Sequence, residues 1–347
     1  MNAISSRSPR PVKSPNEIGL VQSPVSESFN ATPAVVSNCM SISAITQLLV
    51  AHRRQDVTKY IDPSSYDEFP ISGGGFGDIY RGRVLDGTQV AIKRSRFLAS
   101  TTAESQKILK RSAHELYVWS KYNHPNLLRL IGFAQFRGQI AMVSPWMENG
   151  NLSEYIARNP GADRCRFCVQ VCEGVTYLHS MNNVHGDLKA ANVVVSREGI
   201  AKITDFGNTR LQDYTLQFAP TSKGLDFSLR WTAPELVSEQ PAALSNESDV
   251  YALGMTILEV ITGQVPFAGL SELAVLAAVV HRNQTPKRPD SFIPYESNSG
   301  NLLWRTLESC WATDSKARAT AASVRNTMKK ITHHGLSRRD SYVIVNQ

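Results

Sequence analysis

The sequence predicts an α+β fold in which a small strand-rich part precedes a larger, mainly helical part. Two pairs of strand-like segments indicate the first part, one around a turn at 86–87 and one around a turn at 137–138. A helical stretch from about Ala103 to Lys121 separates the pairs, and His-Pro-Asn at 124–126 ends it. Beyond residue 150 the apolar spacing is mostly helical. The expected helices cover 151–159, 162–181, 247–263, 270–282, 301–311 and 320–332.

The 347-residue chain has a globular composition, and its charge is uneven along the sequence. Hydrophobic residues make up 42% and charged residues 19%, which is ordinary for a globular protein. The net charge of +7 belongs to the two ends, because residues 61–315 carry 24 basic and 26 acidic side chains. A basic end can bind nucleic acid or an anionic membrane, but it is more often a solvated, flexible segment. We therefore expect no specific nucleic-acid partner.

Cysteine usage and hydropathy favour a reducing compartment. The five cysteines are an odd number, no secretory signal peptide is visible, and no apolar run approaches the ~18 residues of a membrane span. We expect a cytoplasmic protein, with the nucleus as the alternative. Cys165, Cys168 and Cys172 lie on one face of an expected helix, so core packing is favoured over a metal site.

Composition also sets the expected domain boundaries. Residues 1–40 form a Ser/Pro-rich tail without an apolar period, which predicts disorder. Residues 41–59 read as a short amphipathic helix and linker, and residues 60–332 as the folded domain. Residues 333–347 are basic and unpatterned, and we expect a flexible tail there.

A glycine-rich turn, SGGGFGDIY at 72–80, lies between two expected strands. Such a turn can bring its backbone N–H groups close to phosphates because glycine has no side chain. Its setting between strands argues against a Rossmann turn, and no following GKS or GKT makes a Walker A loop. A flexible turn is the alternative interpretation of a glycine run.

The next strand carries Lys93 at the end of Val-Ala-Ile-Lys. An ammonium group among apolar residues needs an anionic partner or it loses its charge. The long helix offers Glu115 as that partner, and a phosphate would give the pair a use. An isolated strand lysine is more often a surface residue.

Polar side chains also gather around VHGDLKAANVVV at 184–195, which enters a tight hairpin with its turn at 196–199. If Val195 pairs with Ile200, Asn192 falls near Ile203, and Asp205 follows at the same open end. A carboxylate and an amide oxygen suit Mg²⁺, which typically adds substrate phosphates to one or two protein carboxylates.

The loop entering this hairpin holds Asp187 and Lys189. Asp187 could accept a proton from an attacking hydroxyl, and Lys189 could neutralise a moving phosphoryl group. Positioning, metal and charge relief are the requirements of phosphoryl transfer.

These motifs occur in the order found in protein kinases, and the sequence resembles that family over about 61–332. The ordered elements are SGGGFGDIY, VAIK, Glu115, HPN, HGDLKAAN, DFG at 205–207, APE at 233–235, SDVYALG at 248–254 and Arg318. RWTAPE and CWATDSKAR resemble the tyrosine-kinase-like serine/threonine group. The resemblance implies a bilobal fold: an N-lobe over about 60–147 with a five-stranded antiparallel sheet and one helix, and a helical C-lobe over about 148–332.

The resemblance further implies ATP and Mg²⁺ as cofactors, and protein substrates. It gives catalytic roles to Asp187, the base, and to Lys189, Lys93 and Glu115. It places ATP against Ser72, Gly73, Gly74, Gly75, Phe76, Gly77, Ile79, Ala91, Lys93, Ser144, Pro145, Met147, Val194 and Asp205. It assigns Mg²⁺ to Asn192 and Asp205.

Three structural features are implied as well. Glu235 should pair with Arg318, and Asp249 should anchor the catalytic loop from a central helix. The residues expected to stack as a spine between the long helix and the active site are Trp119, Leu130, His185 and Phe206.

Two departures from the family pattern stand out. Ser72 replaces the leading glycine of the phosphate loop, for which we expect a modest effect on nucleotide affinity. Gly186 replaces the arginine of His-Arg-Asp, a residue that normally meets a phosphorylated residue of the activation segment.

The activation segment, residues 208–232, does hold candidate acceptors for such a phosphate. They are Thr209, Tyr214, Thr215, Thr221, Ser222 and Ser228. Because Gly186 has no side chain to meet a phosphate on any of them, we hypothesise activity that does not depend on phosphorylation of this segment.

The acceptor residue in substrates is less directly encoded. Lys189, two residues after Asp187, resembles the serine/threonine pattern, whereas residues 230–235 lean slightly toward tyrosine kinases. We favour Ser/Thr, with dual specificity as an option and a monomer assumed. The alternative function is a pseudokinase that binds nucleotide as a scaffold, although such proteins usually lack at least one catalytic residue.

Overall fold

A computed structural model describes residues 34–36, 42–51, 54–74, 77–95, 102–209, 216–218, 228–238 and 243–336. All of them lie in the unit Pro33–Gln347. The predicted Ser/Pro-rich tail lies outside these residues up to position 33, and so does 337–347 of the basic tail.

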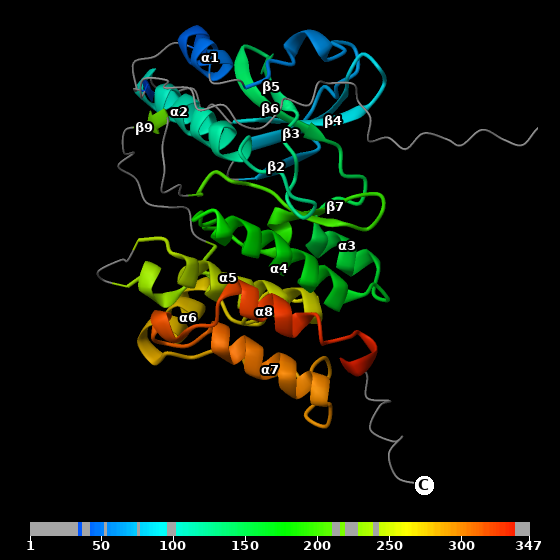
Figure 1. The fold of residues 1–347 in the computed structure, drawn as a ribbon, viewed down its shortest axis with the longest axis vertical. Coiled ribbons are helices and arrows are strands. Elements are labelled where there is room, and N and C mark those ends of the chain that lie inside the picture. Colours follow the sequence, from blue (N-terminus) through cyan, green and yellow to red (C-terminus); the bar gives the residue numbers. More distant parts are fainter. Residues whose placement is uncertain are drawn as a thin grey trace, which may run out of the picture. The chain divides into compact units, whose positions relative to one another are not determined.

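The N-terminal lobe is built on a five-stranded antiparallel sheet with strand order β2-β3-β4-β6-β5 (Figure 1). Its strands are β2 (Ser72–Gly74), β3 (Gly77–Arg83), β4 (Gln89–Arg94), β5 (Gly132–Phe136) and β6 (Gln139–Pro145). Helix α2 (Thr102–Trp119) lies beside the sheet in Figure 1. The predicted small lobe is confirmed, although the strand expected over 127–136 begins only at Gly132.

A second helix, α1 (Ile42–Ala51), lies within the predicted 41–59 segment. Ile45 and Leu49, one turn apart, are buried in the larger hydrophobic core together with residues of α2. The following residues extend along β5, because the Val57 N–H donates to the Phe133 carbonyl. This segment therefore packs on the lobe.

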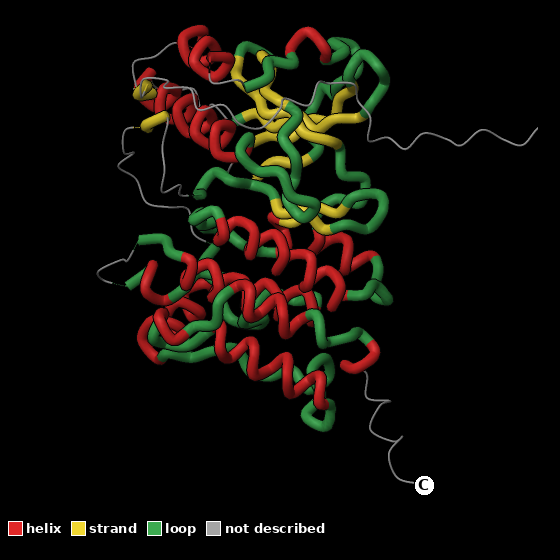
Figure 2. The backbone as a smooth tube through the Cα atoms, in the orientation of Figure 1, coloured by secondary structure: helices red, strands yellow, loops and turns green. Residues whose placement is uncertain are grey.

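The C-terminal lobe is mainly helical, as predicted (Figure 2). Its α-helices are α3 (Leu152–Arg158), α4 (Arg164–Ser180), α5 (Asn246–Thr262), α6 (Glu272–Leu276), α7 (Asn298–Cys310) and α8 (Ala321–Met328). A π-helical stretch, Ala277–His281, continues α6. Short strands β7 (Val193–Val195) and β8 (Ala201–Ile203) form a hairpin at the top of this lobe.

Helix α5 is the central element of the C-terminal lobe. It is buried on every face from Ser248 to Ile261, and the buried residues include the carboxylates of Asp249 and Glu259. A capping box between Ser245 and Ser248 fixes its start, and Gly263 ends it with a left-handed φ of 72°. This rigid helix supports the loop that holds Asp187 and Lys189.

One hydrophobic core joins α2 and β6 to the helices of the C-terminal lobe and to the β7–β8 hairpin. Cys165, Cys168, Cys172 and Cys310 lie inside it as free, buried thiols whose pKa values are raised by burial, so the packing role predicted for the first three holds. Among the helices that the structure describes, none has the length and apolar character needed to span a membrane.

Candidate active site

Lys93 is held between two carboxylates at the boundary of the lobes. Its Nζ lies 2.6 Å from Glu115 Oε1 and 2.9 Å from Asp205 Oδ1. Burial by itself would lower the pKa of Lys93, but the two carboxylates outweigh it and raise the pKa. The same ammonium lowers the pKa of Asp205 against the opposing effect of burial. Lys93 and Asp205 are therefore charged at neutral pH, whereas burial raises the pKa of Glu115.

Asp187 is the centre of a second polar network. Its Oδ2 accepts hydrogen bonds from Lys189 Nζ at 2.9 Å and Asn192 Nδ2 at 2.8 Å. Its Oδ1 accepts one from the Ser228 hydroxyl at 2.7 Å. The carboxylate is buried, and these donors fix its orientation toward the end of the activation segment.

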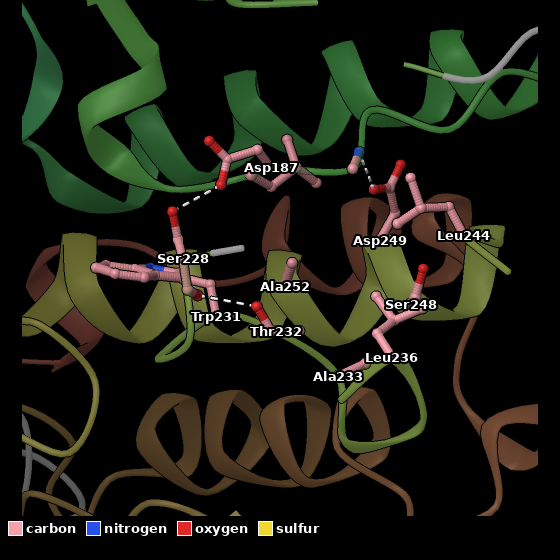
Figure 3. Close-up of a pocket in the computed structure, with 12 residues that line it drawn as sticks. Asp187, Ser228, Trp231, Thr232, Ala233, Leu236, Leu244, Ser248, Asp249 and Ala252 are labelled. Carbon is pink, nitrogen blue, oxygen red and sulfur yellow. Dashed lines mark hydrogen bonds between the residues drawn. The ribbon is translucent and has the colours of Figure 1, made fainter. Parts of the chain in front are cut away.

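Ser228 has a structural place in the site that sequence reasoning missed. Its hydroxyl donates to Asp187 (Figure 3). It also accepts a hydrogen bond from Lys189 Nζ at 2.6 Å, so it bridges the network. The sequence indicated only a candidate phosphate acceptor at this position. Nothing local marked its role, because its contacts lie about 40 residues away in the chain.

The loop holding Asp187 is anchored from below by α5. Asp249, almost fully buried, accepts the N–H groups of His185 at 2.7 Å and Gly186 at 2.9 Å. His179 Nε2 lies 3.1 Å from the same carboxylate. The expected anchor is thus present. The backbone of Gly186 is left-handed, with a φ of 83°, a conformation that glycine adopts without strain.

The register predicted for the hairpin was wrong by one residue. Val195 pairs with Ala201 instead of Ile200, and Val193 pairs with Ile203. Asn192 therefore lies across from Thr204, whose N–H donates to the Asn192 carbonyl at 2.9 Å. The error came from the turn. The Ser196 N–H bonds to the Ile200 carbonyl, so Ser196 and not Val195 lies opposite Ile200, and each following pair shifts by one residue.

The corrected register brings Asn192 next to Asp205, the residue after Thr204. Asp205 itself has a left-handed φ of 69°, which is uncommon for a residue with a side chain and turns its carboxylate toward Lys93. The side-chain N–H groups of Asn192 are directed at Asp187, so its amide oxygen is the atom left to meet a metal. One carboxylate and one amide oxygen fit Mg²⁺ bound together with phosphates.

The aromatic residues expected to form the spine are in contact. The Phe206 ring lies 5.6 Å from His185 and 5.9 Å from Trp119, centroid to centroid. Tyr122 adds a contact with Phe206 at 5.0 Å that was not predicted. Trp119 also donates its indole N–H to the Leu128 carbonyl, which satisfies the buried polar end of this large side chain. The fourth expected member, Leu130, is half-buried against the same core.

The predicted nucleotide-contacting residues lie on the strands around Lys93. Ser72, Gly73 and Gly74 form β2 and pair with β3, which starts at Gly77 and carries Ile79; Gly75 and Phe76 lie outside the described residues. Gly77 cannot carry a side chain, because a Cβ there would lie 2.5 Å from the Arg94 carbonyl oxygen. Ala91 pairs with Ser144 across β4 and β6, and Pro145 ends β6.

The remaining predicted residues lie below this sheet. Met147 packs against the larger core just after β6, and Val194 is half-buried in the middle of β7. The roles assigned to the individual residues stay predictions.

The expected pair between Glu235 and Arg318 is bidentate. Arg318 Nη1 and Nη2 lie 2.7 Å and 2.8 Å from the two carboxylate oxygens, and the guanidinium also donates to the Glu247 and Ala312 carbonyls. The side chain of Arg318 is fully buried. This fork ties the segment after residue 228 to the lower part of the lobe.

A small cavity lies between the catalytic loop and α5 (Figure 3). Ser228 points across it toward Asp187, and the Thr232 hydroxyl donates to the Ser228 carbonyl at 3.0 Å. The lining residues are Gly186, Asp187, Leu188, Ser228, Trp231, Thr232, Ala233, Leu236, Leu244, Ser248, Asp249 and Ala252. The segment 228–236 thus closes over the loop that carries Asp187.

Comparison with known proteins identifies the arrangement. The family model of protein tyrosine and serine/threonine kinases matches residues 68–328, three quarters of the chain. The chain belongs to this kinase family. The bilobal kinase fold and the tyrosine-kinase-like character predicted from the motifs are confirmed.

Relatives of this kinase include both acceptor classes by name. It is 27% identical to serine/threonine-protein kinase STY46 of Arabidopsis thaliana over 75% of this chain and 43% of that protein. It is 30% identical to the probable serine/threonine-protein kinase SIS8 of the same plant, over 75% of this chain and 24% of that protein. It is 29% identical to proto-oncogene tyrosine-protein kinase ROS of Gallus gallus, over 77% of this chain and 12% of that protein. The kinase spans less than half the length of these relatives.

Proposed function

We propose that this kinase is catalytically active and transfers the γ-phosphate of ATP to serine and threonine hydroxyls of proteins. The observation that carries the proposal is the orientation of Asp187, whose two carboxylate oxygens are fixed by Lys189, Asn192 and Ser228. A general base works best when its carboxylate is held in a fixed orientation, and the three donors supply this for Asp187.

The proposed chemistry uses charges that are already paired in the protein. Asp187 accepts the proton of the acceptor hydroxyl, while Lys189 offsets the negative charge of the phosphoryl group in flight. Lys93, kept cationic by Glu115 and Asp205, binds the phosphates of ATP. When bound, Mg²⁺ would supply charge neutralisation at the β- and γ-phosphates, held by Asp205 and Asn192.

Ser228 supports serine and threonine over tyrosine as acceptors. Its own short side chain reaches the carboxylate of Asp187 from the backbone of the 228–236 segment. A substrate chain lying alongside this segment would present its hydroxyl at a similar depth. Serine and threonine carry their hydroxyl close enough to the substrate backbone to reach Asp187 in this way. The tyrosine hydroxyl lies beyond an aromatic ring, so a tyrosine substrate would need a backbone farther from Asp187. Tyrosine phosphorylation remains the second candidate because a relative is named for it.

The pseudokinase alternative predicts nucleotide binding without transfer. All five residues that such proteins tend to lose are present: Lys93, Glu115, Asp187, Asn192 and Asp205. Lys93 bonds to Glu115 and Asp205, and Asn192 bonds to Asp187. The free cysteines further support a reducing compartment, for which we propose the cytoplasm or the nucleus.

The deciding experiment is Mg²⁺-dependent transfer of labelled γ-phosphate from ATP to a generic acceptor protein, followed by analysis of the labelled amino acid. Asp187→Asn and Asp205→Ala are the controls. We expect labelled serine and threonine with the unmodified kinase and a loss of at least about 10²-fold in both variants. Equal signal from all three proteins would disprove catalysis, and label confined to tyrosine would disprove the acceptor assignment.

A further inference from the structure

A short strand from the N-terminal extension pairs with the activation segment. Strand β1 (Ala34–Val36) runs parallel to β9 (Leu216–Phe218), with Ala34 opposite Leu216, Val35 opposite Gln217 and Val36 opposite Phe218. The two strands form a separate sheet from the five strands of the N-terminal lobe (Figure 2). Strand β1 also lies outside the residues that match the kinase family.

The segment that follows β1 is firmly attached to the lobe. In α1, Ile45 and Leu49 are buried to 2% and 1% exposure in the larger core. The Arg54 guanidinium lies over the ring of Tyr117 in α2, 5.1 Å from its centroid. Helix α2 is the helix that carries Glu115, so the N-terminal extension contacts the activation segment and also the helix that positions Lys93.

The residues after α1 continue this attachment along the edge of β5. The Phe133 N–H donates to the Gln55 carbonyl at 2.9 Å, and its carbonyl accepts from Val57 at 2.8 Å. The approach is so close that a Cβ on Gly132 would lie 2.4 Å from the Gln55 carbonyl oxygen. Main-chain bonds therefore hold 54–57 in one register against the sheet.

This attachment makes the short β1–β9 pair effective. Two three-residue strands contribute little stability by themselves. Val36 and Ile42, however, are separated by only five residues, and α1 is fixed to the lobe. The short tether raises the effective concentration of β1 at the activation segment to the order of millimolar, which favours pairing far more than two separate chains would.

The activation segment of this kinase has a particular need for such a contact. Gly186 offers no side chain to bind a phosphate placed on the segment. At its start, the Thr209 hydroxyl lies 3.4 Å from the His185 carbonyl and Arg111 Nη2 lies 3.5 Å from Asn208 Oδ1. At its end, Ser228 is tied to Asp187. The β1 strand contacts the part between these two fixed ends.

We propose that β1, α1 and residues 54–57 form an intramolecular brace that holds residues 216–218 of the activation segment while the site around Lys93 and Asp187 is assembled. The pairing coexists with the Lys93–Glu115 contact and with the Ser228–Asp187 bond, so the brace supports the assembled site instead of blocking it. The brace needs neither a ligand nor phosphorylation, and it takes the place of the contact between an arginine at position 186 and a phosphorylated residue. The effect on turnover rests on the kinase activity proposed above.

Two chains that differ by five residues provide the test, one starting at residue 33 and one at residue 38. Both keep α1 and its buried contacts, and only the first keeps β1. We expect the shorter chain to exchange the amide hydrogens of 216–218 at least about tenfold faster and to lose about three- to tenfold in kcat/KM for a protein acceptor. Unchanged exchange at 216–218 would overturn the brace.

A matched pair of full-length variants separates pairing from sequence. Val35→Pro with Val36→Pro removes two backbone donors, whereas Val35→Thr with Val36→Thr keeps them and keeps β-branched side chains. The proline pair should reproduce the short chain, and the threonine pair should match the unmodified protein; equal behaviour of the two pairs would contradict the proposal. Exchange measured in the Asp187→Asn background needs no turnover, so it tests the brace even if the kinase activity is absent.

Discussion

At the scale of single residues, Glu259 links two parts of the site from the core of α5. Its Oε2 accepts hydrogen bonds from the Ala190 N–H and from the Trp231 indole, each at 2.9 Å. Ala190 belongs to the catalytic loop and Trp231 to the segment that closes over it. Burial raises the pKa of Glu259 to about 7, against the opposing effects of these donors and of Lys189.

Replacement of Glu259 by Gln should change the pH dependence of stability. Because the folded pKa lies above the ordinary value of 4.5, the stabilisation by the neutral carboxyl is complete below 4.5 and is lost as the pH rises through about 7. Gln keeps an acceptor and cannot ionise. The free energy of unfolding of the variant should therefore exceed that of the unmodified protein by up to about 3 kcal/mol at pH 8, and by much less at pH 5.

Thermal unfolding of both proteins between pH 5 and pH 8 measures this difference. Glu272→Gln, at an exposed position in the first turn of α6, serves as the control and should show no such trend. A stability difference for Glu259→Gln that is constant across the range would contradict the raised pKa.

Gly186 makes a second residue-scale prediction. A side chain there has to adopt a left-handed backbone, and its Cβ would lie 2.9 Å from Leu244 Cδ1 and 3.2 Å from the Asn208 carbonyl oxygen. Gly199 has a similar φ of 72°, but a Cβ at that position would have none of the described atoms within 4 Å. Gly186→Ala should cost about 1–2 kcal/mol more than Gly199→Ala in urea unfolding. Equal costs would show that the loop relaxes around residue 186.

At the scale of elements, the Arg318 fork connects the segment containing Glu235 to the loop before α8. Its guanidinium is buried, so removing it leaves the Glu235 carboxylate without its partner. Arg318→Met should destabilise the protein by about 3–5 kcal/mol. Lys329→Met is the control, because its partner Glu173 is partly exposed and such surface pairs contribute about 0–1 kcal/mol. Chemical unfolding of the two variants compares them, and similar losses would argue against a buried pair.

Elements with a strong local pattern were predictable from the sequence. The helices of the C-terminal lobe and the strands around Lys93 follow from apolar spacing and turn residues, and the order of motifs indicated the bilobal fold. The hairpin after Asn192 was off by one residue because its register depends on which turn hydrogen bond closes first. The left-handed backbone of Gly186 was not foreseen either, since glycine permits many conformations.

Contacts between distant segments were the part that sequence could not supply. Ser228 meets Asp187 across 41 residues, and Ala34 pairs with Leu216 across about half of the chain. Neither segment has a distinctive composition, because a single hydroxyl and a three-residue strand recur in any sequence. Tertiary packing of α5 and α1 brings them together, so their roles emerge only in the folded protein.

At the scale of the whole molecule, these long-range contacts bear on how the kinase is switched on. The activation segment is fixed at its start through Thr209 and at its end through Ser228, and residue 186 is not arginine. These two hydroxyls are structural, which removes them from the candidate phosphate acceptors of the segment. The remaining candidates, outside the described residues, are Tyr214, Thr215, Thr221 and Ser222.

Replacing Tyr214 by Phe and the other three by Val or Ala should therefore leave kcat/KM for a protein acceptor within about twofold. In contrast, Ser228→Ala removes the bridge between Asp187 and Lys189 and should lower kcat by about ten- to a hundredfold with little change in the KM for ATP. Both variants are treated with phosphatase before steady-state assays, so that their kcat and KM values are compared in the unphosphorylated state. If the fourfold variant were as inactive as Asp187→Asn, a phosphorylated activation segment would be required, and the fixed ends of the segment would be insufficient to organise it.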